Sequence, residues 1–263
     1  MKNKGFTLIE LLVVIAIIAL LMGILMPALQ KVRDKGKQIQ CVSRVRTLAL
    51  GWWMYKGDND DELVGAMVVN TSWAWARQVP TNAATVEQEI DEAIRKGALY
   101  PYVGKSIEVY RCPSDQRMKD PRQTAYRSFS IANGANGEDW PDPPRDHTVA
   151  KKASDIRQPS SKYIFLEDVD PRGSNVGSWQ MYFGPPGFID PVAMWHGDQT
   201  TMGFADGHAE SHHWENPGFI EWCHGAMYQP TTFQFYYQNP SDEVEDLDFL
   251  AKGFPCKSHA GSQ

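Results

Sequence analysis

The chain has 263 residues, a formal net charge of −6 and 11% aromatic residues. This length accommodates one large or two small domains, and the aromatic side chains supply enough apolar surface for a core, which excludes a disordered chain. An acidic chain without clustered Lys and Arg also argues against nucleic acid as the main partner, because phosphate binding needs a dense positive surface.

The first element is a long apolar run that follows a short, positively charged segment at residues 1–5. Residues 6–29 are nearly all apolar, and no charged or polar side chain occurs between Leu11 and Met26. A hydrocarbon core needs about 20 residues of helix, and only a helix satisfies its own backbone hydrogen bonds there. We therefore expect a transmembrane helix over residues 6–29.

Two other interpretations of this run are a cleaved secretory signal and an ordinary signal anchor. A cleaved signal has a shorter apolar core and a small-x-small cleavage site, which residues 26–30 match poorly. An ordinary anchor has no use for Glu10, since a charge near a bilayer centre costs roughly 2.5–3.5 kcal/mol and usually marks a function.

The start of the run resembles the class III leader of type IV pilins and type II secretion pseudopilins, because it reads GFTLIELLVVIAIIA over residues 5–19. The resemblance implies that a prepilin peptidase cleaves between Gly5 and Phe6 and that Phe6 is then N-methylated. It also implies that Glu10 faces the amino terminus of a neighbouring subunit, where each charge offsets the desolvation of the other. Pro27 falls where this family often carries a helix-bending proline.

The expected partners are therefore a prepilin peptidase, other pilin or pseudopilin subunits, and the lipid of the bacterial inner membrane. Counting basic residues places two before the span and four after it, at Lys31, Arg33, Lys35 and Lys37, which by itself favours a cytoplasmic carboxy-terminal domain. We follow the leader instead, and predict a single-pass protein whose carboxy-terminal domain is exported, in the periplasm or at the cell surface in a filament.

The helix is predicted to continue beyond the membrane over residues 30–56, which gives about 50 residues and near 75 Å at 1.5 Å per residue. Gly57–Asp61 is expected to end it. Apolar residues on this extension recur at three- and four-residue steps, as in an amphipathic helix: Val32, Ile39, Val42, Val45, Leu48, Ala49 and Trp52.

Residues 57–263 are predicted to form the exported globular domain. A second helix is expected over residues 85–97, and Asp206-Gly207 is a strong two-residue hairpin signal. The fold class is therefore α+β and pilin-like, with the long helix packed on a carboxy-terminal antiparallel sheet. Alternating apolar patterns predict the strands: Tyr126–Ile131, Tyr163–Glu167, Met194–His196, Thr201–Ala205 and His208–Trp214.

The four cysteines, an even number, suit an exported domain with two disulfides. Three connectivities exist, and separation along the chain favours Cys41–Cys112 and Cys223–Cys256. The alternative is a set of buried thiols.

His196 is followed, after nine residues, by Asp206-Gly207. With YRCPSD at residues 110–115, RSF at 127–129 and IRQPS at 156–160, this spacing resembles pilin-like proteins that combine a prepilin leader with a carboxy-terminal "H-X9-DG" domain. The resemblance supports the fold and the processing, and implies no reaction.

Oxygen and imidazole donors are frequent in the same region, and Glu167, His196, Asp206 and His208 are the candidate metal ligands. Pseudopilins of the major type resemble calcium binders, so a divalent cation such as calcium is the ion to consider. No EF-hand spacing or His-Glu-x-x-His motif occurs, and we expect no cofactor. The structural interpretation is that Asp206-Gly207 forms a turn and that His196 is a buried imidazole pinning the hairpin.

We expect a structural subunit rather than an enzyme: a pilin or pseudopilin of a type IV pilus or type II secretion pseudopilus. One alternative is a membrane-tethered module that binds glycans or envelope proteins, for which Trp52, Trp53, Trp73 and Trp75 would have to be exposed together. The other is a metal-dependent hydrolase around His196, Asp206 and His208.

Overall fold

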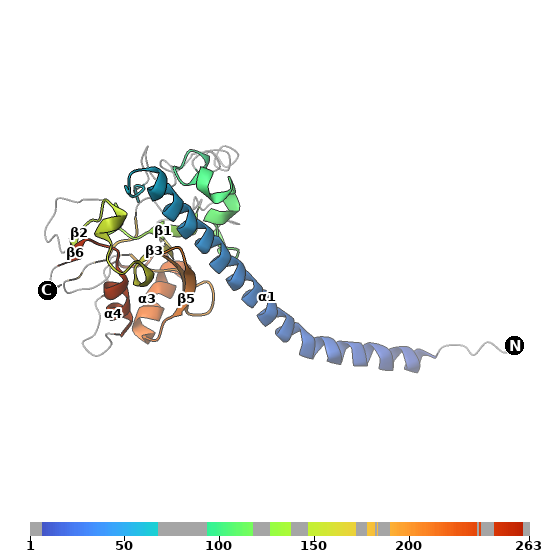
Figure 1. Cartoon of the computed structure of the whole chain (residues 1–263). Helices are drawn as coiled ribbons and strands as arrows, with labels where there is room; N and C mark the ends of the chain where they lie inside the picture. The colour runs from blue at the N-terminus through green and yellow to red at the C-terminus, as the bar shows by residue number, and fades with distance from the viewer. Residues whose placement is uncertain are drawn as a thin grey trace.

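The computed structural model describes residues 7–67, 94–117, 127–137, 147–171, 178–181, 183, 190–235, 237 and 245–259. A long helix, α1 (Leu8–Asp58), leads into a body built on a four-stranded antiparallel sheet (Figure 1). The chain therefore has the α+β arrangement that its sequence predicts.

Helix α1 is continuous over 51 residues, as the leader and its extension predict. Thr7 caps its amino terminus, because its hydroxyl accepts a hydrogen bond from the backbone N–H of Glu10 while the Glu10 carboxylate accepts one from the backbone N–H of Thr7. Asn59 caps the other end, so the helix ends at Asp58, two residues beyond the predicted boundary.

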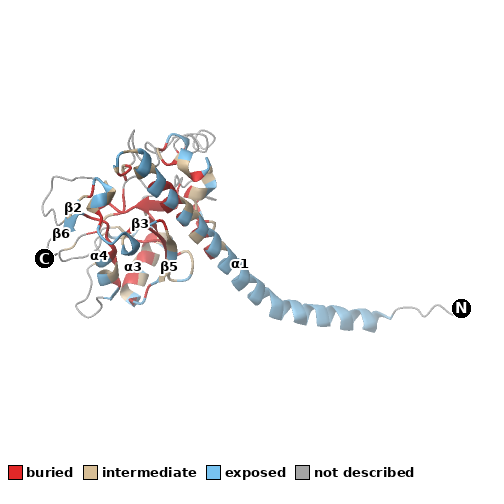
Figure 2. Cartoon of the chain, viewed as in Figure 1, coloured by how far each residue is buried: buried red, intermediate tan, exposed pale blue. Residues whose placement is uncertain are grey.

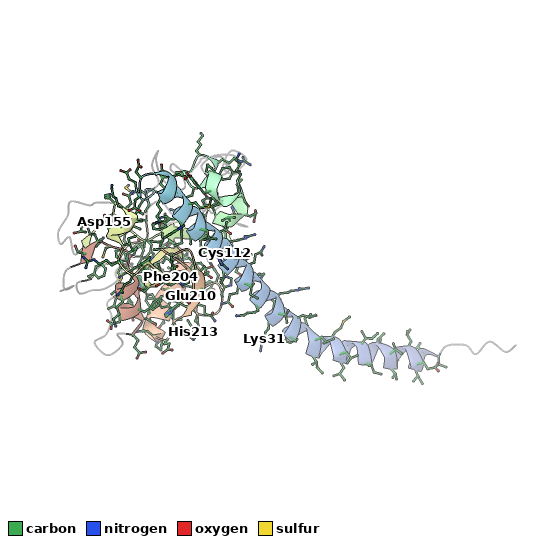
Figure 3. The ribbon with its side chains drawn as sticks, in the orientation of Figure 1. Lys31, Cys112, Asp155, Phe204, Glu210 and His213 are labelled. Carbon is green, nitrogen blue, oxygen red and sulfur yellow. The ribbon has the colours of Figure 1, made fainter. Side chains whose placement is uncertain are left out.

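The path of α1 changes direction part-way along its length (Figure 1). Pro27 lies inside the helix, where it cannot donate a backbone hydrogen bond and its ring crowds the preceding turn. Lys31, labelled in Figure 3, lies close to the bend. The bend separates the apolar half of the helix from the half that packs on the body.

The distal half of α1 buries one face against the sheet. Cys41, Val45, Leu48 and Trp52 are all buried, at the three- and four-residue steps that place side chains on one helical stripe. A glycine on the sheet permits close approach, since a Cβ added to Gly203 would lie 2.8 Å from Val45 Cγ1. These buried residues lie within the extension predicted over residues 30–56.

The main sheet has the order β1-β3-β4-β5. Helices α3 (Pro217–Tyr228) and α4 (Glu245–Gly253) supply buried residues to the core on the face opposite α1. A separate two-stranded ribbon joins β2 (His147–Thr148) to β6 (Ser258–His259). The four strands of the main sheet are β1 (Phe129–Ile131), β3 (Tyr163–Glu167), β4 (Gln199–Phe204) and β5 (Ala209–His213).

Both faces of the sheet are covered, so β1 and β3 are buried throughout and β4 is buried from Thr200 to Phe204. The core between α1 and the sheet contains Phe129, Ile131 and Phe165. The second core contains Trp214, Phe219 and other aromatic side chains that pack edge to face. Two short 3-10 turns, η1 (Tyr100–Val103) and η2 (Ile107–Tyr110), pack against α1. Two others are η4 (Ala153–Asp155) and η5 (Pro159–Ser161).

The strand predictions hold for four of the five segments. Tyr163–Glu167 is reproduced residue for residue, and β4 and β5 lie within two residues of their predicted bounds. Strand β1 ends where predicted but begins at Phe129, three residues later than the predicted start, which lies outside the described residues. The prediction of a strand at Met194–His196 was wrong, because Gly197 and Asp198 adopt positive φ values of 69° and 51° and turn the chain into β4. Most of the predicted helix at 85–97 lies outside the described residues.

Candidate functional site

The proximal half of α1 is a surface without a partner in the single chain. Every described residue from Thr7 to Gly36 is exposed, as the pale helix in Figure 2 shows. The helix is long and apolar enough to cross a membrane, and none of its most apolar 18-residue window is buried. A helix from the core of a soluble protein would bury this window, so the apolar half is built to meet lipid or another helix.

Glu10 lies in this apolar half, where it closes a local hydrogen-bond ring with Thr7. The backbone N–H and the hydroxyl of Thr7 both donate to Glu10 Oε2, each at 2.8 Å. The carboxylate is thus oriented toward the amino-terminal end of the helix. The predicted processing residues, Gly5 and Phe6, lie outside the described residues.

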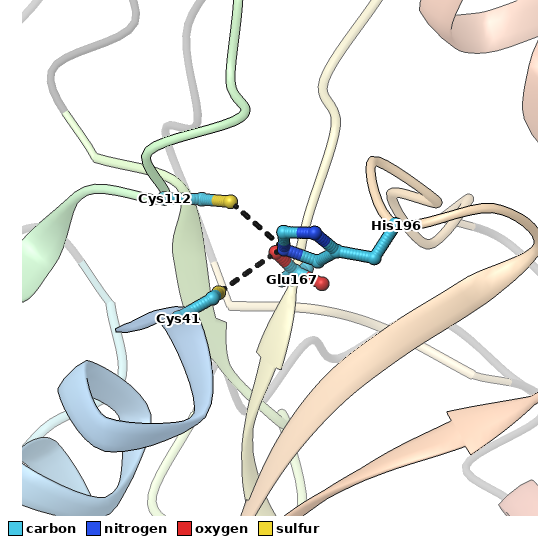
Figure 4. Close-up of side chains that lie close together, drawn as sticks. All are labelled: Cys41, Cys112, Glu167 and His196. Carbon is cyan, nitrogen blue, oxygen red and sulfur yellow. Dashed lines mark hydrogen bonds and ion pairs between the residues drawn. The ribbon is translucent and has the colours of Figure 1, made fainter. Parts of the chain in front are cut away.

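A second site lies where α1 meets the body, and it joins Cys41, Cys112, Glu167 and His196 (Figure 4). One ligand-type atom from each residue lies within 4.8 Å of the others. Cys41 Sγ donates to Glu167 Oε1 at 3.0 Å, Cys112 Sγ lies 3.2 Å from His196 Nε2, and that nitrogen lies 3.3 Å from Glu167 Oε1. The side chains of Glu167 and His196 are only 0% and 2% exposed.

Four separate elements bring these side chains together. Cys41 lies on the buried stripe of α1, and Cys112 follows η2. Glu167 is the last residue of β3, and His196 lies in the turn that leads into β4. The site therefore forms only when the helix, a loop and the sheet are packed together.

Neighbouring groups hold two of the four side chains in place. Glu167 Oε2 accepts the backbone N–H of Thr201 at 2.7 Å, which leaves Oε1 directed at Cys41 and His196. The Cys112 sulfur accepts the backbone N–H of Ser114 at 3.4 Å. Hydrogen bonds of this kind fix the orientation of side chains that can serve as metal ligands.

A buried polar network also holds the loop that carries Cys112. The backbone N–H of Cys112 donates to Ser128 Oγ, and that hydroxyl donates to Asp115 Oδ2, each at 2.8 Å. Asp115 in turn accepts two hydrogen bonds from the Arg117 guanidinium, whose Nη2 also donates to the carbonyl of Asp168 beside Glu167. The YRCPSD and RSF segments noted in the sequence thus meet at this loop.

Burial and mutual contact shift the acid–base properties of the cluster. Burial raises the pKa of the Cys41 thiol well above its usual range, and Cys112 and Glu167 raise it further. Burial alone would lower the pKa of His196, but contacts with Cys112 and Glu167 outweigh it and raise the pKa to about 10. The imidazole of His196 therefore favours its protonated form at neutral pH.

The structure does not contain the two predicted disulfides. All four cysteines are buried thiols. Cys41 and Cys112 have their sulfurs directed at Glu167 and His196, and Cys223 and Cys256 are in the core between the sheet and α3 and α4.

The predicted metal ligands separate into two places. Glu167 and His196 are together, but Asp206 and His208 instead contact each other at the β4–β5 turn, with 2.5 Å between Oδ1 and Nδ1. Gly207 in that turn has a φ of 94°, so the predicted hairpin is confirmed. His196, which contacts Glu167, is a buried imidazole as the structural interpretation expects.

Two other acidic residues of this region, Asp168 and Asp198, each contact a different neighbour. Asp168 accepts a hydrogen bond from Ser130 at 2.5 Å, and Asp198 lies 3.1 Å from His224. The binding-module alternative needs the tryptophans to be exposed together, but Trp52 is buried while Trp53 is 42% exposed. Trp73 and Trp75 lie outside the described residues.

Cys41 and Cys112 are the members of the cluster that the sequence did not indicate as metal ligands. Their even count pointed to disulfides, and no ligand spacing links them to Glu167 or His196. Each cysteine carries only a weak indication of its place in the fold. Cys41 lies on the buried stripe of the helix, and Cys112 is the first residue of the CPSD segment.

Comparison with known proteins identifies the amino terminus. A family model described as the prokaryotic N-terminal methylation motif matches residues 1–26. The comparisons with curated proteins and with solved structures give no match. The motif and the exposed apolar helix together indicate a type IV pilin-like or pseudopilin-like protein with a single-pass membrane anchor, processed by a prepilin peptidase.

Proposed function

We propose that the chain is a structural subunit of a type IV pilus or a type II secretion pseudopilus. A prepilin peptidase cleaves it between Gly5 and Phe6, Phe6 is N-methylated, and the mature chain assembles through α1. Residues 6–29 lie in the inner membrane before assembly and in the filament core afterwards. The body is exported and decorates the filament.

The observation that carries this proposal is the exposed apolar half of α1. It begins with the methylation motif and continues, without a break, into the helix that forms the spine of the body. An anchor alone needs the apolar length, but it does not need a carboxylate within it. A subunit that packs helix against helix has a use for both features, because buried charges of opposite sign on neighbouring chains offset each other's desolvation.

Glu10 has a specific role in this proposal. In the single chain its Oε2 accepts both hydrogen bonds from Thr7, which becomes the second residue after cleavage. In the filament, the same carboxylate accepts from the methylated amine of a neighbouring Phe6. Assembly thus exchanges a local cap for an intersubunit ion pair in a region without water.

The test is to express the chain in a host with a prepilin peptidase, and to examine the membrane fraction and sheared surface material. Mass spectrometry is expected to find a mature chain that begins with N-methyl Phe6, and electron microscopy to find it in filaments. Glu10→Ala is expected to insert and to be cleaved, yet to yield no filaments. Asp34→Ala, which removes an exposed carboxylate from the same helix outside the apolar run, is the matched control and assembles normally.

Normal filaments in the Glu10→Ala variant would contradict the proposed role of Glu10. A chain that is processed but never enters filaments would instead support a membrane-tethered binding module.

A further inference from the structure

We propose that Cys41, Cys112, Glu167 and His196 bind one Zn²⁺ ion, and that this ion cross-links α1 to the sheet. The inference is independent of filament assembly, because it rests on the geometry inside a single body. The four residues lie outside the methylation motif at residues 1–26 and outside the apolar half of α1 that is proposed to mediate assembly.

The donor set points to zinc among the common biological cations. Two sulfurs, one imidazole nitrogen and one carboxylate oxygen are the donor types that proteins use for Zn²⁺. Calcium prefers six to eight oxygen ligands and magnesium an octahedral oxygen shell, so neither suits a pocket with two sulfurs. Calcium, the divalent cation considered from the sequence, therefore does not fit these four residues.

The spacing of the four atoms is close to that of a tetrahedral zinc site. With Zn–S about 2.3 Å and Zn–N or Zn–O about 2.0–2.2 Å, a sulfur lies about 3.5 Å from an N or O ligand, and N and O lie about 3.4 Å apart. The corresponding distances here are 3.2 Å for Cys112 and His196, 3.0 Å for Cys41 and Glu167, and 3.3 Å for His196 and Glu167. These three separations lie within about half an ångström of the tetrahedral values, and every pair of the four ligand atoms lies within 4.8 Å.

The site is closed, which indicates a structural ion rather than a catalytic one. Catalytic zinc keeps a position open for water or substrate, whereas structural zinc has four protein ligands. Cys41 is 0% and Cys112 3% exposed, and the side chains of the other two ligands are equally buried. The metal-dependent hydrolase considered above needs an open position that this cluster does not offer.

Binding replaces protons and changes no oxidation state. The two thiols lose their protons to become thiolates, and His196 loses the proton on Nε2, while Glu167 binds as a carboxylate. Two thiolates, a carboxylate and a neutral imidazole around Zn²⁺ carry a net charge of −1, as does the familiar Cys₃His site. The N–H groups of Ser114 and Thr201 donate to the Cys112 sulfur and to Glu167, and so stabilise this negative charge.

The ion would fasten elements that are distant in the chain. Cys41 and Glu167 are 126 residues apart, and Cys112 and His196 are 84 apart. Because the ligands exist together only in the folded body, zinc binding adds its free energy to folding and resists the detachment of α1 from the sheet.

The experiment uses the full chain, without a histidine tag, purified in detergent micelles under reducing conditions. Elemental analysis is expected to find one zinc per chain. Replacement by Co²⁺ is expected to give the absorption bands of a tetrahedral site with thiolate-to-cobalt charge transfer. Cys41→Ser and Cys112→Ser each weaken the charge-transfer band and lower zinc affinity by at least tenfold. Cys223→Ser, a buried thiol in the other core, is the matched control and leaves both unchanged.

X-ray absorption at the zinc edge tests the unaltered chain, so the result does not depend on whether a variant folds. Two sulfur and two nitrogen or oxygen ligands are expected. A reduced, folded chain that takes up no zinc, a cobalt complex without the thiolate band, or a zinc shell without sulfur would each overturn the proposal. A Cys41–Cys112 disulfide in chain isolated without added reductant would do the same.

Discussion

Gly203 offers a direct test of how closely α1 packs on the sheet. Its added Cβ would lie 2.8 Å from Val45 Cγ1 and 3.3 Å from Ala49 Cβ. Carbon atoms prefer separations of about 3.5–4.0 Å, so Gly203→Ala creates an overlap of about 0.7 Å with a branched, stiff side chain. Overpacking of this kind costs about 1–3 kcal/mol, and alanine regains about 0.5–1 kcal/mol of strand propensity. The net expectation is a destabilisation of about 0.5–2 kcal/mol.

The assay is urea or thermal unfolding of the full chain in detergent micelles, followed by tryptophan fluorescence. For a domain of this size, 1 kcal/mol corresponds to about 2–4 °C in the melting temperature. Gly36→Ala is the matched control, because Gly36 lies in α1 with no atom within 4 Å of the added Cβ. This substitution is expected to stabilise the helix by up to about 1 kcal/mol. The same chemical change therefore has opposite signs at the two positions.

A double substitution tests the assigned contact itself. Val45→Ala removes the methyl group that the new Cβ would meet, so the Gly203→Ala, Val45→Ala pair is expected to be less destabilised than the sum of the two single changes. A Gly203→Ala variant as stable as the wild type, or more stable, would refute the close packing. So would strict additivity in the double-mutant cycle.

Three further predictions concern other parts of the fold. Burial alone would raise the pKa of Asp246, but contacts with His212 and with the backbone N–H groups of Asn216 and Glu215 outweigh burial and lower the pKa. The ionised carboxylate therefore stabilises the fold above about pH 4, the usual pKa of a free Asp. This stabilisation is lost as the pH falls through the lowered pKa of the folded state. Asp246→Asn should accordingly flatten the fall in unfolding free energy between about pH 4 and pH 2, and an unchanged slope would contradict this. Arg127→Met should lower the free energy of unfolding in urea by about 3 kcal/mol or more, because Arg127 is fully buried and donates hydrogen bonds to the carbonyl of Phe129 and the hydroxyl of Ser130. A decrease of less than about 1 kcal/mol would contradict this prediction. Pro27→Leu should restore a backbone donor and straighten α1, so the distance between spin labels on either side of the bend increases, and an unchanged distance would show another cause for the bend.

The parts of the fold that follow from local sequence were predictable. Apolar length and periodicity predicted α1 almost to its last residue, and the pair Asp206-Gly207 predicted the β4–β5 turn. The fold also explains the nine-residue spacing between His196 and Asp206. This spacing spans the turn after His196, the six residues of β4 and one residue more, so the histidine and the turn mark the two ends of a single strand.

Helix α3 and the turn after His196 were not predicted, for identifiable reasons. Asn216 caps α3 and Pro217 opens it, which are recognisable start signals. The segment that follows is mostly aromatic and apolar, and only Glu221 and His224 mark a polar side of the helix. Met194–His196 reads as an apolar run, and only the positive φ values of the next two residues reveal a turn.

The cluster of Cys41, Cys112, Glu167 and His196 could not be predicted as a unit. Motifs for metal sites depend on ligands two to five residues apart on one element, whereas these four lie on four elements. What brings them together is the packing of α1 against β3 and β4, which is a property of the tertiary fold.

The shared role of α1 as anchor and core sets the order in which this protein folds. The helix is synthesised first, yet its buried stripe is covered by β3 and β4, which follow more than 100 residues later. Contacts between such distant segments form slowly, because the chain must lose the entropy of closing a large loop before the contacts stabilise it. Until residue 204 has been synthesised, a growing chain exposes the stripe around Val45 as an unprotected hydrophobic surface next to the membrane. A chain stopped before β4 would therefore be a target for chaperones and proteases, however well its amino terminus is inserted.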